Sequence, residues 1–335
     1  MIKYLGSKRK LTGLILEAVS GYPNAKRVLD LFSGTSRVGH ALKGAGYQVL
    51  ANDHNAYAHT LAQCYVEADA ESHAELAQKW IDELNRVPGK AGWFTATYCE
   101  EARFFHPKNG ARIEAIREKI AAEDLPPLLR AILLVSLMEA ADRVDSTCGV
   151  QMAYLKNWAA RAHGDLTLRL PDLLPASAHG PGQAFHLEAK EAAKLDADVA
   201  YLDPPYNQHS YLSNYHVWES LVQWDHPEVY GRAQKRVDCQ TRKSPFNYRR
   251  TFREAFDGVL QALAAPNWII SFSDEGFMPR PDMEALLSQY GEVTVIAQDY
   301  KRYVGAQIGQ HNLQGERVGE VSHLYNTEFL YLVRR

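Results

Sequence analysis

The sequence lacks several patterns that mark common classes of protein. Its four cysteines form no C-x-x-C pair and its histidines have no metal-ligand spacing, so no metal site or disulfide framework is predicted. The most apolar run, AILLVSLM (131–138), is far shorter than the about 20 residues that span a bilayer. No apolar stretch follows the basic N-terminus, so no signal peptide or membrane contact is expected. We therefore expect a cytoplasmic protein with reduced cysteines.

The glycine-rich stretch DLFSGTSRVG lacks what two familiar nucleotide sites need. Gly34 and Gly39 have the spacing of a phosphate-binding P-loop, but His40 follows in place of the lysine. Ser36 stands where a G-x-G-x-x-G dinucleotide site has its middle glycine, so the backbone cannot approach a pyrophosphate closely. The turn favours a small nucleoside ligand, with Asp53 accepting hydrogen bonds from its ribose hydroxyls. A plain tight turn beside an exposed acid is the alternative.

Length and composition fit a soluble α/β protein of one large domain or two, with 335 residues, 46% hydrophobic and 23% charged. The order strand, glycine turn, helix and strand in 26–53 predicts a parallel βαβ unit. Residues 63–180 show helical periodicity and no clear strand. We predict one seven-stranded α/β sheet from residues 1–62 and 181–335, interrupted by a helical insertion. The predicted strands are 26–32, 47–53, 184–188, 198–203, 267–273, 292–300 and 327–333.

The stretch YLDPPY (201–206) ends an apolar run with an acid and two prolines. Pro204 and Pro205 remove two backbone donors and fix two φ angles. Asp203 is expected at the carboxyl end of a strand, where open parallel sheets bind ligands. Its carboxylate and the Pro204 carbonyl can both accept from one planar amino group, and Tyr206 offers a flat face for stacking. A proline-stiffened loop with a capping aspartate is the alternative interpretation.

Taken in order, DLFSGTSRVG, LAND and YLDPPY resemble the motifs of Dam-like (D12 class) DNA adenine-N6 methyltransferases that use S-adenosylmethionine. The N-terminal KYLGSKRKL resembles the leading motif of that family. NQHSYLSNYHVWESL and TRKSPFNYRRTF resemble the D12 half of methyltransferases from type IIS restriction–modification systems. The resemblance covers most of the chain. It implies a Rossmann-like methyltransferase sheet with residues 63–180 as a target-recognition domain, S-adenosylmethionine as cofactor, and double-stranded DNA as substrate. It leaves three settings open: a solitary enzyme, a component of phage defence, or a restriction–modification enzyme with a restriction endonuclease or a second methyltransferase as its companion.

The resemblance also implies roles for individual residues. Tyr4 would pack on the cofactor, Lys8 would neutralise its methionine carboxylate, and Asp53 would hold its ribose. Family members often carry an aspartate that contacts the cofactor's adenine, followed by an aromatic residue. The nearest equivalent here is Glu188 followed by Ala189, so the acid is longer and the aromatic residue is missing. Asp203, Pro204, Pro205 and Tyr206 would form the catalytic loop. The full set of implied cofactor residues is Tyr4, Gly6, Ser7, Lys8, Asp30, Phe32, Gly34, Thr35, Asp53 and Glu188.

Methylation of adenine inside a duplex requires the base to be flipped out, and phosphate contacts must hold the DNA meanwhile. Residues 232–253 carry eight basic side chains against Asp238 alone, a net charge of +7 on a chain whose formal net charge is −3. We expect this segment to bind phosphates, although a solvated basic loop has the same composition. The predicted DNA-binding residues are Arg236, Arg242, Lys243, Asn247, Arg249 and Arg250, with Arg112 and Lys156 of the insertion.

Two other functions remain open at this point. An enzyme of this type could modify an adenine or guanine amine in RNA, and a catalytically idle scaffold could bind DNA. The intact YLDPPY motif favours catalysis over an idle scaffold. Protein glutamine methyltransferases favour Asn, and cytosine-N4 enzymes usually carry Ser, at the position of Asp203.

Overall fold

A seven-stranded sheet forms the centre of the computed structural model, which describes residues 1–6, 8–152, 155, 157–301 and 325–335. The strand order is β3-β2-β1-β4-β7-β9-β8. All seven predicted strands are confirmed, and β1, β2, β3, β4 and β7 pair in parallel. The antiparallel insertion of β9 between β7 and β8 was not predicted. The strands are β1 (Arg27–Asp30), β2 (Gln48–Asn52), β3 (Gln183–Phe185), β4 (Val199–Leu202), β7 (Asn267–Ser273), β8 (Glu292–Lys301) and β9 (Tyr325–Arg334).

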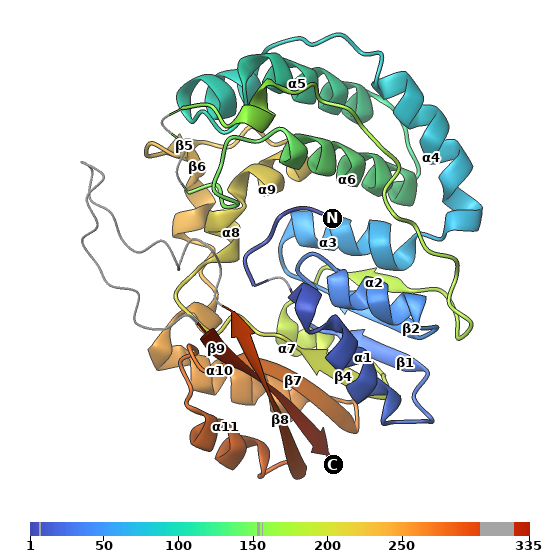
Figure 1. Cartoon of the computed structure of the whole chain (residues 1–335), viewed down its shortest axis with the longest axis vertical. Coiled ribbons are helices and arrows are strands. Elements are labelled where there is room, and N and C mark those ends of the chain that lie inside the picture. Colours follow the sequence, from blue (N-terminus) through green and yellow to red (C-terminus); the bar gives the residue numbers. More distant parts are fainter. Residues whose placement is uncertain (7, 153–154, 156, 302–324) are drawn as a thin grey trace.

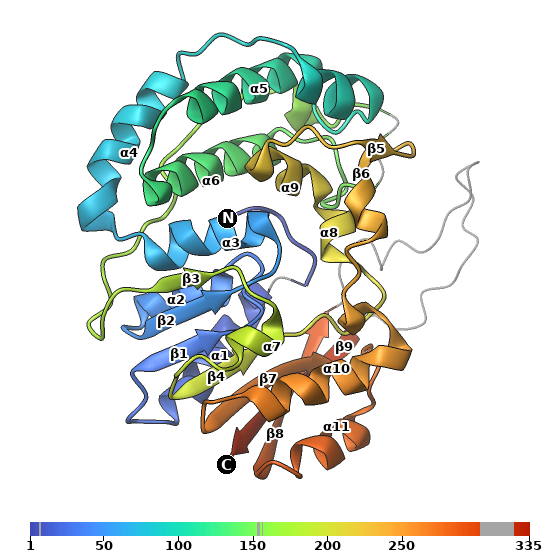
Figure 2. The same cartoon turned by 180° about the vertical axis from the view of Figure 1, so that it is seen from behind.

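Helices cover both faces of this sheet because its strands are apolar on both sides. Neighbouring residues such as Val28 and Leu29 point to opposite faces and are both fully buried. Val28 packs with α1 (Thr12–Ser20) and α2 (Arg37–Gly44), seen in front of the sheet in Figure 1. On the other face, shown in Figure 2, Leu29 belongs to the core formed with α7 (Ala189–Ala192), α10 (Arg249–Ala262) and α11 (Arg280–Leu287).

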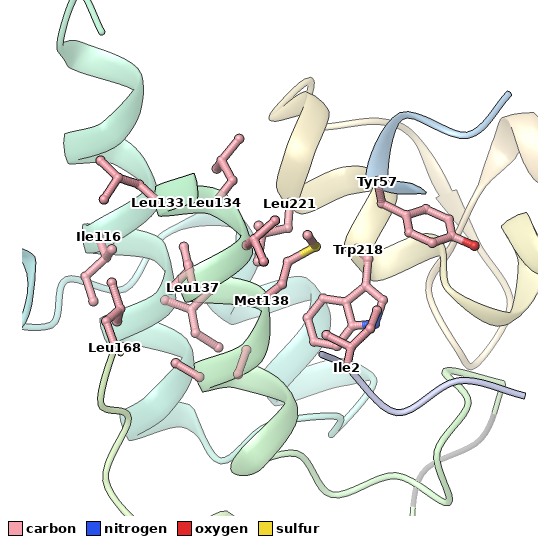
Figure 3. Close-up of a cluster of buried hydrophobic side chains, with 14 of the residues drawn as sticks. Ile2, Tyr57, Ile116, Leu133, Leu134, Leu137, Met138, Leu168, Trp218 and Leu221 are labelled. Carbon is pink, nitrogen blue, oxygen red and sulfur yellow. The ribbon is translucent and has the colours of Figure 1, made fainter. Parts of the chain in front are cut away.

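The predicted helical block lies above the sheet as a second layer (Figure 1). Its helices are α4 (Ala70–Leu84), α5 (Pro107–Ala122) and α6 (Pro127–Arg143), with π-helical turns at η2 (Gln63–Glu67) and η3 (Thr95–Glu101). Helix α3 (Ala56–Ala62), which ends just before the predicted block, contributes to the same core. Helix α6 is the central one, since it is apolar nearly all round and most of its side chains are buried. In Figure 3 its residues Leu137 and Met138 lie between Ile116 of α5 and Trp218 of α9.

A second excursion from the sheet, after β4, joins this helical layer. It contains α8 (Tyr211–Asn214), α9 (His216–Gln223), β5 (Val229–Tyr230) and β6 (Lys235–Arg236). Trp218 and Leu221 of α9 are buried in the same core as α5 and α6. The helical body therefore draws on residues after the proposed insertion 63–180. The remaining short 3₁₀ segments are η1 (Lys8–Lys10), η4 (Ala160–His163), η5 (Val237–Gln240) and η6 (Pro245–Asn247).

Two features are absent from the described residues. None of their helices is both long and apolar enough to cross a bilayer. In the same part of the chain, no three histidine, cysteine, aspartate or glutamate side chains are grouped so that they could hold a metal ion.

Candidate active site

A cavity of about 310 Å³ lies at the carboxyl ends of β1, β2 and β4. The chain runs from β1 outward to β2 and β3 on one side, and from β4 to β7 on the other. Loops that follow β1 and β4 therefore leave in opposite directions, which opens a crevice in sheets of this kind. The cavity is lined by residues from the segments 4–8, 30–38, 52–55, 187–189, 201–212 and 241–247.

The glycine turn after β1 forms one wall of this cavity. Gly34 has φ +51°, and its N–H donates to Oδ2 of Asp53 at 3.1 Å. A Cβ on Gly34 would lie 3.4 to 3.6 Å from the ring of Tyr4, so the turn and the ring are already in close contact. Ser36 also has a left-handed backbone, with φ +57°, and stands directly before α2. Thr35 and Phe32 line the same wall.

Asp30, the last residue of β1, places a buried carboxyl group under the turn. The N–H of Gly39 donates to its Oδ2 at 3.0 Å. Burial, with the charges of Asp203 and Asp53, raises the pKa of Asp30 to about 7, although the Gly39 hydrogen bond opposes the shift. Gly39 is required by close packing, because a Cβ there would lie 2.9 Å from Val66 Cγ2.

Asp203 follows β4 and opens into the same cavity as Gly34 and Asp53. Its Oδ1 lies 3.1 Å from Nζ of Lys8, which also lies 3.4 Å from Oε2 of Glu328. Burial raises the pKa of Asp203 to about 6; Lys8 opposes this shift and Glu328 adds to it. Burial disfavours the charge of Lys8, but Asp203, followed by Tyr206, Glu328 and Tyr201, outweighs it, and the pKa of the ammonium lies above its usual value. Glu328 was not predicted from the sequence as a site residue.

The two prolines and Tyr206 stiffen the turn beside Asp203. Pro204 is buried, and Pro205 lines the cavity. The ring of Tyr206 lies 5.2 Å from that of Phe272, centroid to centroid, and Nζ of Lys8 lies 5.5 Å from the Tyr206 centroid. The Tyr206 carbonyl accepts from the N–H of Phe277 at 3.0 Å. These contacts anchor the turn from behind, and Tyr206 is not among the residues that line the cavity.

A stack of tyrosines continues the wall formed by the glycine turn, and its members Tyr4 and Tyr211 line the cavity. Tyr4 lies nearly parallel to Tyr211 and Tyr215, with centroids 5.1 and 4.6 Å away. The Tyr215 hydroxyl accepts from the N–H of Leu5 at 2.6 Å. Gly6, with φ +76°, passes close to the Tyr211 hydroxyl. The N-terminal segment is thus attached to α8 and α9. Tyr211 and Tyr215 were missed because a single sequence gives no sign that they meet Tyr4.

The loop 241–247 forms the rim of the cavity. Arg242 donates to Glu219, a fully buried acid of α9, at 2.9 Å, and also to the His54 carbonyl at 3.4 Å. The amide of Asn247 donates to the Asn207 and His209 carbonyls, at 2.9 and 3.1 Å. The rim loop is therefore tied both to α9 and to the segment that follows the YLDPPY turn. Three of the predicted DNA-binding side chains here are exposed: Lys243, Arg249 and Arg250.

Arg236 does not reach the surface. Its side chain is 4% exposed, and its two terminal nitrogens lie 2.7 Å from the two carboxylate oxygens of Asp225, with Asp238 at 3.1 Å. A guanidinium committed to two carboxylates is not available to phosphate, so we remove Arg236 from the expected DNA surface. Arg112 donates to the Asn85 carbonyl at 2.9 Å and ties α5 to the end of α4.

The remaining predicted residues are Glu188, Ser7 and Lys156. Glu188 lines the cavity, with Oε1 3.8 Å from Nδ1 of His54, and precedes α7. Ser7 and Lys156 lie outside the described residues.

Comparison with known proteins agrees with this geometry. Residues 4–264 match the model of the D12 class N6 adenine-specific DNA methyltransferase family. The type II methyltransferase M.NlaIII of Neisseria lactamica is 27% identical over 98% of this chain and all of its own length. M.CviAII of Paramecium bursaria Chlorella virus 1 is 30% identical over 90% of this chain and 92% of its own. M.FokI of Planomicrobium okeanokoites is 28% identical over the whole chain, which spans only 53% of that relative. The chain therefore belongs to the D12 class of N6 adenine-specific DNA methyltransferases, and its activity is methylation of adenine N6 in DNA.

Proposed function

We propose that the cavity binds S-adenosylmethionine and a flipped-out adenine side by side. The Asp203 carboxylate and the Pro204 carbonyl would each accept a hydrogen bond from the N6 amine of that adenine. One observation carries this proposal. Asp203, Gly34 and Asp53 line the same cavity, although Asp203 lies far from the other two in the sequence. Transfer of a methyl group requires donor and acceptor in near-contact, and a shared cavity allows that.

The residues at the β1 and β2 ends fit this cofactor. Gly34 has no side chain at the place where the turn meets Tyr4, which leaves a narrow space beside an aromatic face. Asp30, Asp53 and Asp203 gather carboxyl groups at one edge of the sheet, and such a cluster favours a cationic ligand. S-adenosylmethionine carries a sulfonium and an ammonium group. When bound, it supplies a methyl group on a positively charged sulfur. We assign its ribose to Asp53 and its adenine side to Glu188, whose segment lines the cavity.

The chain's own residues activate the amine by position and charge. The N6 lone pair of adenine is delocalised into the ring, so the amine is a poor nucleophile. Two acceptors on its hydrogens, Asp203 and the Pro204 carbonyl, localise that pair on nitrogen. In the transfer, nitrogen would form the bond to the methyl carbon as the bond from that carbon to the sulfonium sulfur breaks, and the electron pair of the broken bond would stay on the sulfur. The methylated nitrogen would then release one proton, which the Asp203 carboxylate can receive. With a pKa near 6, Asp203 is mostly ionised at neutral pH and is an acceptor as the reaction begins.

The rim supplies the phosphate contacts that base flipping needs. Flipping costs a few kcal/mol, and stacking on an aromatic side chain returns about 1–3 kcal/mol. Arg249 and Arg250 begin α10, whose first turn carries no acid. Positive side chains at a helix N-terminus are unfavourable for the helix and favourable for an anion. We assign phosphate contacts to these arginines with Lys243 and Asn247, and a positioning role at the rim to Arg242.

The wider context is proposed from the relatives. Their names describe type II methyltransferases. We propose that this chain marks a specific DNA site within a restriction–modification system in the cytoplasm, with an endonuclease or a second methyltransferase as its companion. Residues 63–180, including Arg112, would read the site.

Transfer of a tritiated methyl group from S-adenosylmethionine to duplex DNA tests this proposal. Asp203→Ala should lower the rate about 100- to 1,000-fold, the range for loss of one preorganised hydrogen-bond partner in a transition state. Binding of S-adenosylmethionine, followed by calorimetry, should survive the substitution. Asp282→Ala, at an exposed aspartate of α11, is the matched control. An Asp203→Ala variant with wild-type activity, or labelling of RNA without duplex DNA, would refute the proposal.

A further inference from the structure

Lys8 lies between two carboxylates that come from distant parts of the chain. Its ammonium is 3.1 Å from Asp203 and 3.4 Å from Glu328. All three side chains are largely buried, with 6% of Lys8, 20% of Asp203 and 12% of Glu328 exposed. One cation therefore serves two acids in a setting where water screens little. Glu328 belongs to none of the motifs recognised in the sequence.

The sheet explains why both acids reach the same lysine. Asp203 follows β4, and Glu328 lies on β9, with β7 between the two strands. The backbones of strands separated by one neighbour lie about 10 Å apart, and both side chains reach toward the Lys8 ammonium that lies between them. Glu328 pairs with Ser273 of β7. Ser271 and Ser273 of β7 are small and buried.

The position of Lys8 creates a competition for Asp203. The ammonium lies against Oδ1, and the target amine needs a carboxylate oxygen of the same residue as its acceptor. Glu328 gives the ammonium a second partner of the same kind. A lysine with only Asp203 as its acid would hold that carboxylate more tightly, and the amine would have to displace it.

We propose that Glu328 is a positioning residue for methyl transfer, which retains the Lys8 ammonium while Asp203 accepts the hydrogen bond of the target amine. This inference rests on the proposed role of Asp203. Glu328 acts through Lys8 and touches neither the base nor the methyl group.

The electrostatic surroundings of Asp203 give this role a measurable signature. The charged and titratable groups that face it are Lys8 of η1, Glu328 of β9, Asp30 of β1, Tyr211 of α8, and Tyr201 and Tyr206 of its own segment. Glu328 raises the pKa of Asp203, and Lys8 lowers it. Removal of the Glu328 charge therefore lowers the pKa of Asp203, and the acid side of the pH–rate profile moves to lower pH.

Glu328→Gln tests the inference, with Glu292→Gln at an exposed position of β8 as the matched control. We expect Glu328→Gln to lower kcat roughly tenfold, to raise KM for DNA, and to shift the acid limb of kcat/KM down by roughly one pH unit. Glu292→Gln should match wild type in all three. Glu328→Asp keeps the charge on a shorter side chain, so it should keep the wild-type acid limb even if it loses some activity.

A Lys8→Met background separates this role from a structural one. If Glu328 acts through Lys8, adding Glu328→Gln to Lys8→Met should leave kcat unchanged or raise it. An equal loss in both backgrounds, or a Glu328→Gln variant with the kcat and acid limb of Glu292→Gln, would overturn the inference. These results differ from the result that would refute the proposed function, which is an Asp203→Ala variant with the activity of the wild type.

Discussion

The basic segment 232–253 contains side chains with two different tasks, and substitutions should separate them. Arg236 is buried and forms a bidentate ion pair with Asp225 and a second ion pair with Asp238. Lys243, Arg249 and Arg250 are exposed. We predict that Arg236→Met lowers stability and leaves DNA binding intact. A triple variant, Lys243→Ala with Arg249→Ala and Arg250→Ala, should weaken DNA binding and leave stability unchanged.

The magnitudes follow from burial. Removal of one partner from a buried ion pair costs about 3–5 kcal/mol. The side chain of Asp225 is 40% exposed and that of Asp238 26%, so water compensates part of the loss. For Arg236→Met we expect a free energy of unfolding lower by about 2 kcal/mol. The triple variant should reduce the slope of log Kd against log salt by about 0.9 for each phosphate that the protein no longer neutralises.

Urea unfolding and fluorescence anisotropy on a labelled duplex over a series of KCl concentrations measure these two quantities. This division of tasks would be contradicted by an Arg236→Met variant that unfolds at the wild-type urea midpoint but has a smaller slope of log Kd against log salt. A triple variant that keeps the wild-type slope would contradict it equally, because the exposed arginines and lysine would then face solvent only.

Three further predictions concern the carboxyl groups and the turn. Because protonated Asp203 offers a donor where an acceptor is needed, kcat/KM should fall as the pH drops through about 6, the value to which burial raises its pKa; a pH–rate profile checks this. Asp30 has a pKa of about 7 in the fold against 3.8 unfolded. The native state therefore binds more protons between these values, and its stability falls as pH rises from about 4 to 7. Asp30→Asn should remove about 3 kcal/mol of the stability difference between pH 5 and pH 8, measured by urea unfolding at these two values. Gly39→Ala should lower the melting temperature, since its Cβ would lie 2.9 Å from Val66 Cγ2 and overpacking costs about 1–3 kcal/mol.

The fold was largely predictable because its signals are local. Each strand is a short apolar run closed by a turn, and β7 was predicted at its observed bounds. The place of β9 between β7 and β8 was not predictable in this way, because strand order depends on contacts between distant residues. The same limit applies to the helical layer. Trp218 joins the core of α5 and α6 from outside the proposed insertion.

In the candidate site, too, residues in local motifs were predictable, and residues defined by distant partners were not. Gly34, Asp53 and Asp203 were identified because each lies at, or two residues after, the end of a predicted strand and belongs to a recognisable motif. Arg236 was misplaced because composition alone cannot distinguish a basic surface from a buried ion pair, and its partner Asp225 lies outside the basic segment. Glu328 was missed because its partner Lys8 lies 320 residues earlier in the chain.

The two ends of the described chain thus complete one site. Residues 4–264 match the family model, and they contain the glycine turn, the YLDPPY turn and the rim. Glu328 lies beyond that range, on a strand that pairs along its whole length with β8 and along seven residues with β7. Removal of β8 and β9 would therefore expose the edge of β7 and also leave Lys8 with Asp203 as its single carboxylate partner among those described. Such a truncated chain would retain every motif by which the family is recognised, yet its Asp203 would be less free to accept the target amine.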